Sequence, residues 1–435
     1  MNRIKPVALI IMQYEVVIVL GVTGLSLVFT SLAPFAVAVV ASFWILRWIR
    51  FGYPSIRTPN DWTVVILVVM AAVTIWATAL PDTTRPQVYR LLLGIGFYYA
   101  IMNWTDSQLK LRLLIAALSL TGLFLSIFGL FSVQWTTNKI PFMPDFIYNY
   151  IPTLVSDLIH RNVLAGTLVL IIPIPIALLI YSWHEIKKIE KIIFTISTIT
   201  MIVILILSQS RAGWMAFGLS MAILALMGGK WTRLLLLMGI FIGIIAIFFV
   251  GIAPFLNAVI ASNSIGGIEG RIETWSRALY MVQDFPFTGV GMGSYMTVAD
   301  TLYPFTRLGH GTVDHAHNLF FQLGVDLGIP GLIGWLATLM IIFIISWQLY
   351  RKGKHSTNNV LMGLGIGCFC SQVALCTHGI LDAVTWGMVR PAPIVWAIWG
   401  MAVVSGLLIL ISDQEYKTNP KQKQLKKSNT ELPLK

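Results

Sequence analysis

Charged residues are scarce in this sequence. Asp, Glu, Lys and Arg make up only 11% of its 435 residues, whereas an ordinary soluble domain carries about 25%. Hydrophobic residues make up 57%, and a soluble fold of this length cannot hide so much apolar surface. The composition therefore excludes a cytosolic globular enzyme, a disordered chain and a fibre, and it leaves a bilayer-spanning protein.

Cysteine is also rare. Cys368, Cys370 and Cys376 all lie in one apolar segment, and no Cys-x-x-Cys pair is present. Three cysteines exclude a secreted disulfide scaffold, and their setting indicates small buried side chains in a membrane helix.

Long apolar runs fill most of the chain. A helix needs about 20 apolar residues to cross the hydrocarbon core, and the runs predict an all-α polytopic fold of about twelve transmembrane helices. Residues 1–412 then form a single transmembrane domain. The predicted spans are 7–24, 29–47, 62–80, 87–103, 111–134, 162–182, 191–208, 212–229, 233–252, 317–349, 359–379 and 391–412.

The distribution of basic residues predicts the orientation. The net charge is +12, and most Lys and Arg fall in cytoplasmic loops if the N-terminus is placed inside. Both termini are then cytoplasmic, and residues 413–435 form a basic, disordered tail. Because the excess charge faces the anionic inner leaflet, we expect no nucleic-acid partner.

A long external loop is predicted between the ninth and tenth spans, at residues 251–316. Within it, Ile272, Trp275, Leu279 and Val282 recur at helical spacing, which predicts an amphipathic helix over residues 271–284. We expect this loop to be ordered, to contain short helices and to lie on the outer membrane face.

Four basic or titratable side chains are predicted to gather at the outer face: Arg161, Arg211, Arg271 and His317. A charged group near hydrocarbon is costly, so such groups are usually paired, or face water or a ligand. Arg161 and Arg211 could instead be interfacial anchors.

Two further alternatives concern the external loop. Arg271 could form a surface ion pair with Glu269 or Glu273. A metal site is conceivable among His310, Asp314, His315 and His317, but the spacing is irregular and cysteine partners are lacking.

Several short strings occur in order around these side chains. They are Asn162-x-x-Ala165, Ser210-Arg211-Ala212-Gly213, Gly270-Arg271-x-x-x-Trp275, Pro286-x-x-Gly289-x-Gly291-x-Gly293-x-Tyr295, and His317-Asn318 followed by Gly328-x-x-Gly331. Together, over residues 160–335, they resemble the O-antigen ligase family of bacterial membrane glycosyltransferases.

That resemblance implies transfer of a glycan from an undecaprenyl-pyrophosphate carrier to an acceptor hydroxyl, such as one on a lipid A core or another glycan. The reaction would take place on the outer side of the bacterial plasma membrane, among membrane lipids and without cofactor or metal. It implies that Arg211 and Arg271 bind the pyrophosphate and that His317 acts on the acceptor. The expected substrate-binding residues are Arg161, Asn162, Trp275, Tyr295 and Asn318.

The chemistry of the side chains agrees with these roles. Planar Arg forks bind phosphate oxygens bidentately and stabilise the charge that grows on a leaving diphosphate. An acceptor hydroxyl needs a base, and an unperturbed His titrates near pH 6.5.

Other activities stay open. A repeat-unit polymerase of the best-known type carries Arg-x10-Gly motifs, and no Gly follows Arg161, Arg211, Arg271, Arg277 or Arg307 at that spacing, which favours a ligase. A lipid-linked oligosaccharide flippase or other transporter would show repeated halves and ionisable groups near the membrane midplane.

Overall fold

The computed structural model describes residues 10–133, 135, 148, 151–152, 154, 159–250, 267–309, 311–387 and 392–418. Within these ranges the chain is helical and contains no strand, which confirms the all-α prediction. The helices are α2 (Glu15–Val28), η1 (Thr30–Leu32), α3 (Ala33–Phe51), α4 (Asp61–Ala77), α5 (Pro81–Trp104), α6 (Gln108–Ser132), α8 (Arg161–Ile171), α9 (Pro173–Tyr181), α10 (Lys188–Leu207), α11 (Arg211–Met227), α12 (Lys230–Val250), α14 (Ile268–Asp284), α15 (Tyr295–Leu302), α16 (Leu319–His355), α17 (Asn359–Leu381) and α18 (Pro393–Thr418).

Six helical segments in the described part of the chain are long and apolar enough to cross a membrane, and four shorter helices are also apolar. These helices make the protein a multi-pass membrane protein. Every predicted span overlaps a helix, but the count of twelve and the side of each terminus stay predictions. Helix α18 continues to Thr418, into the range expected to be a tail, and residues 419–435 lie outside the described ranges.

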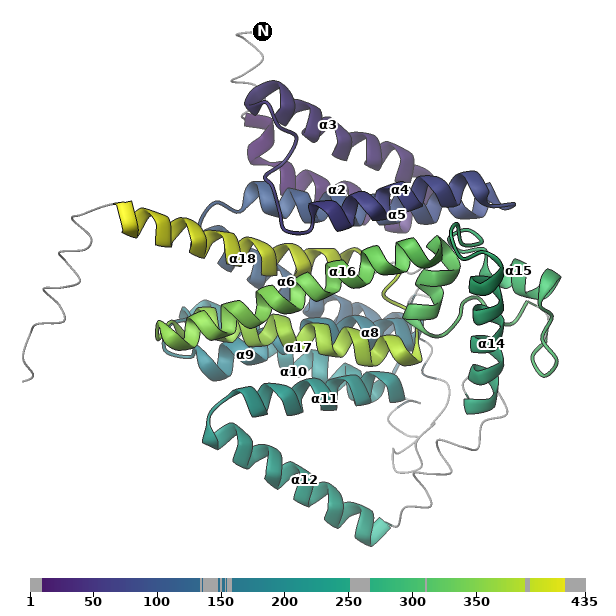
Figure 1. Cartoon of the computed structure of the whole chain (residues 1–435). Helices are drawn as coiled ribbons and strands as arrows, with labels where there is room; N and C mark the ends of the chain where they lie inside the picture. The colour runs from purple at the N-terminus through teal and green to yellow at the C-terminus, as the bar shows by residue number, and fades with distance from the viewer. Residues whose placement is uncertain are drawn as a thin grey trace, which may run out of the picture.

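Helix α17 lies at the centre of the bundle, where it packs against α16, α9, α11 and α8 (Figure 1). A Cβ atom at Gly365 would lie 2.3 Å from the backbone nitrogen of Tyr350. Glycine therefore lets α16 and α17 approach backbone to backbone, as small residues commonly do between membrane helices. Helices α2 to α5 form a second group, which joins the first through α18 and α16.

The bundle has two chemically different ends. One end carries the N-termini of α8, α11 and α16 and the C-terminus of α17, with α14 and α15 beside it (Figure 1). The opposite end carries Arg47, Lys110, Lys188 and Arg351, and we call it the basic end. Helix α16 runs from one end to the other.

Helix α16 is broken near its start. Gly328 has a φ of +68° and precedes Pro330, which cannot donate a backbone hydrogen bond. The glycine-rich segment after α14 fits against this break: Val290 N–H donates to the Val325 carbonyl (2.8 Å), and Ile329 N–H donates to the Pro286 carbonyl (2.7 Å). The segment therefore fixes α14 and α15 to the bundle.

Helix α14 confirms the helix predicted over residues 271–284, and the predicted apolar face is only partly buried: Trp275 and Val282 pack inward. Ile272 is 57% exposed and Leu279 is 43% exposed, whereas Ala278 and Met281 are buried. The buried face packs against α15 and the start of α16. Small and flexible side chains fit this close contact, and helical spacing alone does not reveal that preference.

Candidate active site at the end of the bundle

Three helices begin at this end with a side-chain cap. The caps are the His160 imidazole, which accepts from Asn162 N–H, the Ser210 hydroxyl, which accepts from Gly213 N–H, and the Asn318 amide oxygen, which accepts from Phe320 and Phe321 N–H. Such caps satisfy amide groups that lack partners within the helix. They place Arg161 and Arg211 at the first helical positions, where the helix dipole also favours an anion.

Asp382 lies at the centre of the site, directly after α17. It is 2% exposed, and its Oδ1 lies 3.4 Å from His317 Nδ1 and 3.7 Å from His315 Nε2. Asn162 donates to its Oδ2 at 3.3 Å. Burial alone would raise the pKa of Asp382, but the His317 hydrogen bond and the nearby histidines hold that pKa well below its usual range. Asp382 is therefore a buried carboxylate at neutral pH.

The two histidines lie next to each other beside this carboxylate, with ring centroids 4.2 Å apart and the ring planes tilted by 53°. The backbone N–H of His317 donates to His315 Nδ1 at 3.1 Å. The ring proton of His315 is therefore on Nε2, which faces Asp382. Burial, with His317 adding to it, lowers the pKa of His315 to about 4. His315 is therefore neutral at pH 7.

His317 has an unusual backbone conformation, with a φ of +46°. Gln209, next to the Arg211 turn, has a φ of +48°. Left-handed φ is uncommon outside glycine and clusters at functional sites. It turns the His317 ring toward Asp382 and leaves its side chain 21% exposed.

Arg271 lies near the carboxylate, and Arg211 lies near Arg271. Arg271, from α14, donates through Nη1 to the Leu381 carbonyl. Burial lowers the pKa of Arg271, Asp382 opposes that effect and Arg211 adds to it. Arg211 therefore lies close enough to repel Arg271. Arg161 interacts electrostatically with the Tyr148 hydroxyl, which donates to the Leu207 carbonyl at 3.2 Å.

The charge balance of the site follows from these positions. Arg271 acts on the Asp382 carboxylate, Arg211 adds a second positive charge near Arg271, and His315 is neutral. The site therefore carries a positive excess that favours an anionic ligand. The alternative ion pairs of Arg271 are not observed, because Glu269 pairs with Arg307 and Glu273 pairs with Arg277.

Asn162 and Asn318 hold the site together. Asn162 links α8 to Asp382, whereas Asn318 both caps α16 and donates through Nδ2 to the Ile380 carbonyl at 3.0 Å. Both predicted residues therefore lie beside His317 and Asp382. Their hydrogen bonds position the site.

Trp275 and Tyr295, which were predicted to bind substrate, both pack against neighbouring parts of the protein. Trp275 packs edge-on against Phe321, with ring centroids 6.1 Å apart. Tyr295 is fully buried, and its hydroxyl donates to the Thr274 carbonyl at 2.8 Å. The ring of Tyr295 packs against α14 and the start of α16, so it is not exposed for stacking on a sugar, and its role in substrate binding stays a prediction.

A metal-ligand group does exist within the described residues, but it differs from the one considered from the sequence. His315, His317 and Asp382 offer ligand atoms within 4.8 Å of one another, whereas Asp314 is not part of the group and residue 310 lies outside the described ranges. Arg271 acts electrostatically on both His315 and Asp382. Its positive charge opposes a second cation at the same place.

Sequence reasoning missed Asp382. It follows the apolar helix α17 and is far from His317 in the chain. The available signal was the string His378-Gly379-Ile380-Leu381-Asp382, which places a charged residue at the outer end of a predicted span. His315 was considered only as a metal ligand.

Residues 196–336 match the family model described as O-antigen ligase. The match includes Arg211, Arg271 and His317, whereas Arg161 and Asp382 lie on either side of it. No curated protein sequence matches the chain.

Proposed function

We propose, from the match of residues 196–336 to the O-antigen ligase family model, that the protein is a membrane glycosyltransferase of this type and transfers a glycan from undecaprenyl pyrophosphate to an acceptor hydroxyl. The acceptor would be a lipid A core sugar or a comparable glycan, and the reaction would occur at the outer face of the bacterial plasma membrane.

The observation that carries this proposal is the contact between His317 Nδ1 and Asp382 Oδ1. A carboxylate that accepts the Nδ1 proton leaves Nε2 with its lone pair, which is the arrangement of a general base. His317 Nε2 takes the proton of the acceptor hydroxyl, and the resulting oxygen attacks the anomeric carbon. The bond from that carbon to the diphosphate oxygen breaks, and its electron pair stays with the diphosphate.

The arginines act on the leaving group. Arg271 and Arg211 lie close enough to repel one another, and we propose that one diphosphate contacts both. Their positive charges stabilise the negative charge that develops on the bridging oxygen, more in the transition state than in the bound donor. The Arg271 contact with the Leu381 carbonyl keeps its guanidinium next to Asp382, which limits the reorganisation needed during reaction.

The opposite end of the bundle supports the proposed sidedness. Basic residues of cytoplasmic loops determine orientation in the plasma membrane, and the basic end lies across the bundle from His317. An external site suits a carrier-linked glycan that has already crossed the membrane.

A reconstituted assay tests this function. The full chain in lipid vesicles receives an undecaprenyl-pyrophosphate glycan with a lipid A core acceptor, with a second donor molecule as acceptor, or with neither. We expect transfer to the core acceptor, no change on adding EDTA, and at least a hundredfold loss of rate in His317→Ala, the scale for removing a general base. His184→Ala, which changes an exposed histidine on the opposite side, is the matched control.

Each arm can overturn part of the proposal. Elongation of the second donor instead of transfer to the core would identify a polymerase. Loss of activity with EDTA would show that transfer needs a bound metal ion, and it would overturn the assignment of His317 as the general base. Transport of the donor across the vesicle membrane without a new glycosidic bond would identify a transporter.

A further inference from the structure

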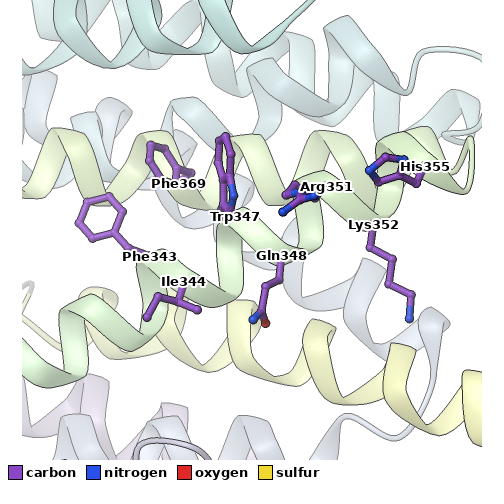
Figure 2. Close-up of a pocket in the computed structure, with 8 residues that line it drawn as sticks. All are labelled: Phe343, Ile344, Trp347, Gln348, Arg351, Lys352, His355 and Phe369. Carbon is purple, nitrogen blue, oxygen red and sulfur yellow. The ribbon is translucent and has the colours of Figure 1, made fainter.

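The last turns of α16 line an open groove at the basic end (Figure 2). The groove lies against α17 and has a volume of about 780 Å³. Its lining residues are Phe343, Ile344, Trp347, Gln348, Arg351, Lys352, His355 and Phe369. Four of them recur every fourth residue and form one stripe along α16.

One half of this groove is apolar. Phe369 of α17 packs against Phe343 and Trp347, with ring centroids 5.1 and 6.0 Å away. Ile344 is 50% exposed and Trp347 is 43% exposed. Such side chains on a membrane-crossing helix form a surface that fits an acyl chain.

The other half is cationic. Figure 2 shows Phe343, Trp347, Arg351 and His355 following one another along the helix, so the aromatic part gives way to the basic part within two turns. Lys352 adds a second positive charge, and none of the eight lining side chains is acidic. An apolar channel that ends in two cations matches the layout of an anionic phospholipid.

A second groove lies on the other side of the same turns. It runs between α16 and α18, has a volume of about 150 Å³, and includes Ile345, Leu349 and Leu407. Gln348 and Lys352 line both grooves. A phosphate held near Lys352 can therefore send one acyl chain to each side of α16.

We propose that this double groove binds one anionic phospholipid of the inner leaflet, with its phosphate at Arg351 and Lys352 and its chains along the two faces of α16. The site is separate from the proposed glycan transfer. Arg351 lies about 35 Å along the helix from the break at Gly328, from a rise of about 1.5 Å per residue.

Native mass spectrometry of the full chain tests the site. Delipidated protein is titrated with phosphatidylglycerol, cardiolipin and phosphatidylcholine. We expect one anionic lipid to stay bound and phosphatidylcholine to be lost. Arg351→Gln together with Lys352→Gln is expected to weaken binding of the anionic lipid about thirtyfold, because each basic residue near a membrane surface contributes about fivefold.

The matched control is Lys187→Gln together with Lys188→Gln, an adjacent, exposed cation pair at the start of α10. It removes the same charge from the same end without touching the groove, and we expect wild-type binding. Equal weakening by both pairs would show only general surface attraction and would overturn the site. Equal retention of phosphatidylcholine would overturn the headgroup assignment.

A fluorescence measurement locates the acyl chains of the bound lipid. Phosphatidylglycerol with brominated acyl chains quenches tryptophan at short range, and the signal of Trp347 is the difference between the wild type and Trp347→Phe. We expect this difference to be quenched more strongly by the brominated anionic lipid than by brominated phosphatidylcholine. Equal quenching by the two lipids would contradict the proposal even if the charge variants bind less lipid.

Discussion

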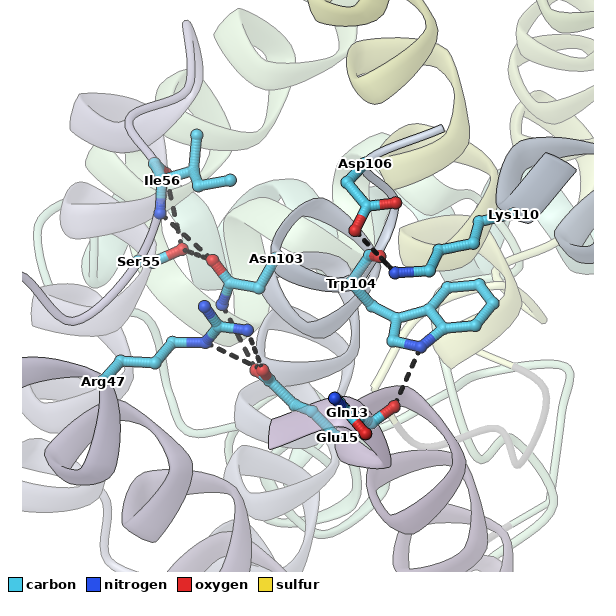
Figure 3. A network of polar contacts seen from close by, with 9 residues as sticks. All are labelled: Gln13, Glu15, Arg47, Ser55, Ile56, Asn103, Trp104, Asp106 and Lys110. Carbon is cyan, nitrogen blue, oxygen red and sulfur yellow. Dashed lines mark hydrogen bonds and ion pairs between the residues drawn. The ribbon is translucent and has the colours of Figure 1, made fainter. Parts of the chain in front are cut away.

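Two buried carboxylates at opposite ends of the bundle have different surroundings. Glu15 is 1% exposed at the basic end and accepts hydrogen bonds from Arg47 (Nε, 2.8 Å) and from Asn103 (Nδ2, 3.2 Å) (Figure 3). Asp382, at the other end, is 2% exposed and faces two histidines and Asn162.

The two carboxylates also differ in the charges around them. Glu15 and Arg47 neutralise one another within the core, and the pair links α2 to α3. Near Asp382, the Arg271 Nη1 donates to a backbone carbonyl instead, and His317 stays partly exposed. Arg47 and Asn103 occupy the oxygens of Glu15. Asp382 instead orients His317, whose partly exposed ring can react.

The largest expected effect comes from Asp382→Asn. An amide in this position cannot favour the Nδ1-protonated form of His317 as a carboxylate does, so its Nε2 becomes a poorer base. We expect the transfer rate in the vesicle assay to fall by roughly 10²–10⁴-fold, the range for losing general base catalysis, while donor binding changes little.

Glu15→Gln is the matched control for Asp382→Asn, since it makes the same change from carboxylate to amide in the buried group that pairs with Arg47. We expect its rate per folded molecule to stay within a few fold of the wild type. A comparable loss of this rate in both variants would mean that the loss is not specific to the contact between Asp382 and His317, and it would overturn the orienting role of Asp382.

The second effect concerns stability. Glu15→Ala leaves the buried Arg47 without its partner, and breaking such a pair costs about 3–5 kcal/mol. We expect the free energy of unfolding, measured in mixed detergent micelles, to fall by that amount. Replacing both residues by leucine removes the unpaired charge. The double variant should therefore regain most of the lost free energy of unfolding.

If Glu15→Ala unfolds at the same denaturant concentration as the wild type, the pair contributes nothing to stability. The contrast with the Asp382 site would then disappear.

The smallest effect is a change in pH dependence. The pKa of His315 is lowered from 6.5 to about 4, chiefly by burial, so between these values the unfolded chain binds a proton that the folded chain does not. The stability that His315 contributes is therefore complete above pH 6.5 and is lost as the pH falls toward 4, by about 1 kcal/mol per pH unit.

His315→Gln should flatten this decline when unfolding is followed between pH 4 and 7. His184→Gln, at an exposed position, should keep the decline of the wild type. An unchanged slope in His315→Gln would mean that the low pKa of His315 does not contribute to the pH dependence of stability.

Local patterns predicted much of this molecule. Apolar runs located the helices, and the caps before Arg211 and after His317 agree with the predicted helix starts. The contact between His317 and Asp382 could not be predicted, because it depends on how α16 packs against α17. The buried face of α14 was only partly predicted for the same reason, since its small residues fit a partner that the helical spacing does not specify.

The backbone at His317 has one more consequence. Glycine is the residue that most easily adopts a φ of +46°, so selection for folding alone would favour glycine at this position. A side chain kept there against the backbone preference indicates a compromise between stability and activity. Attempts to engineer a more heat-resistant version of the protein should therefore leave position 317 unchanged and seek their gains elsewhere.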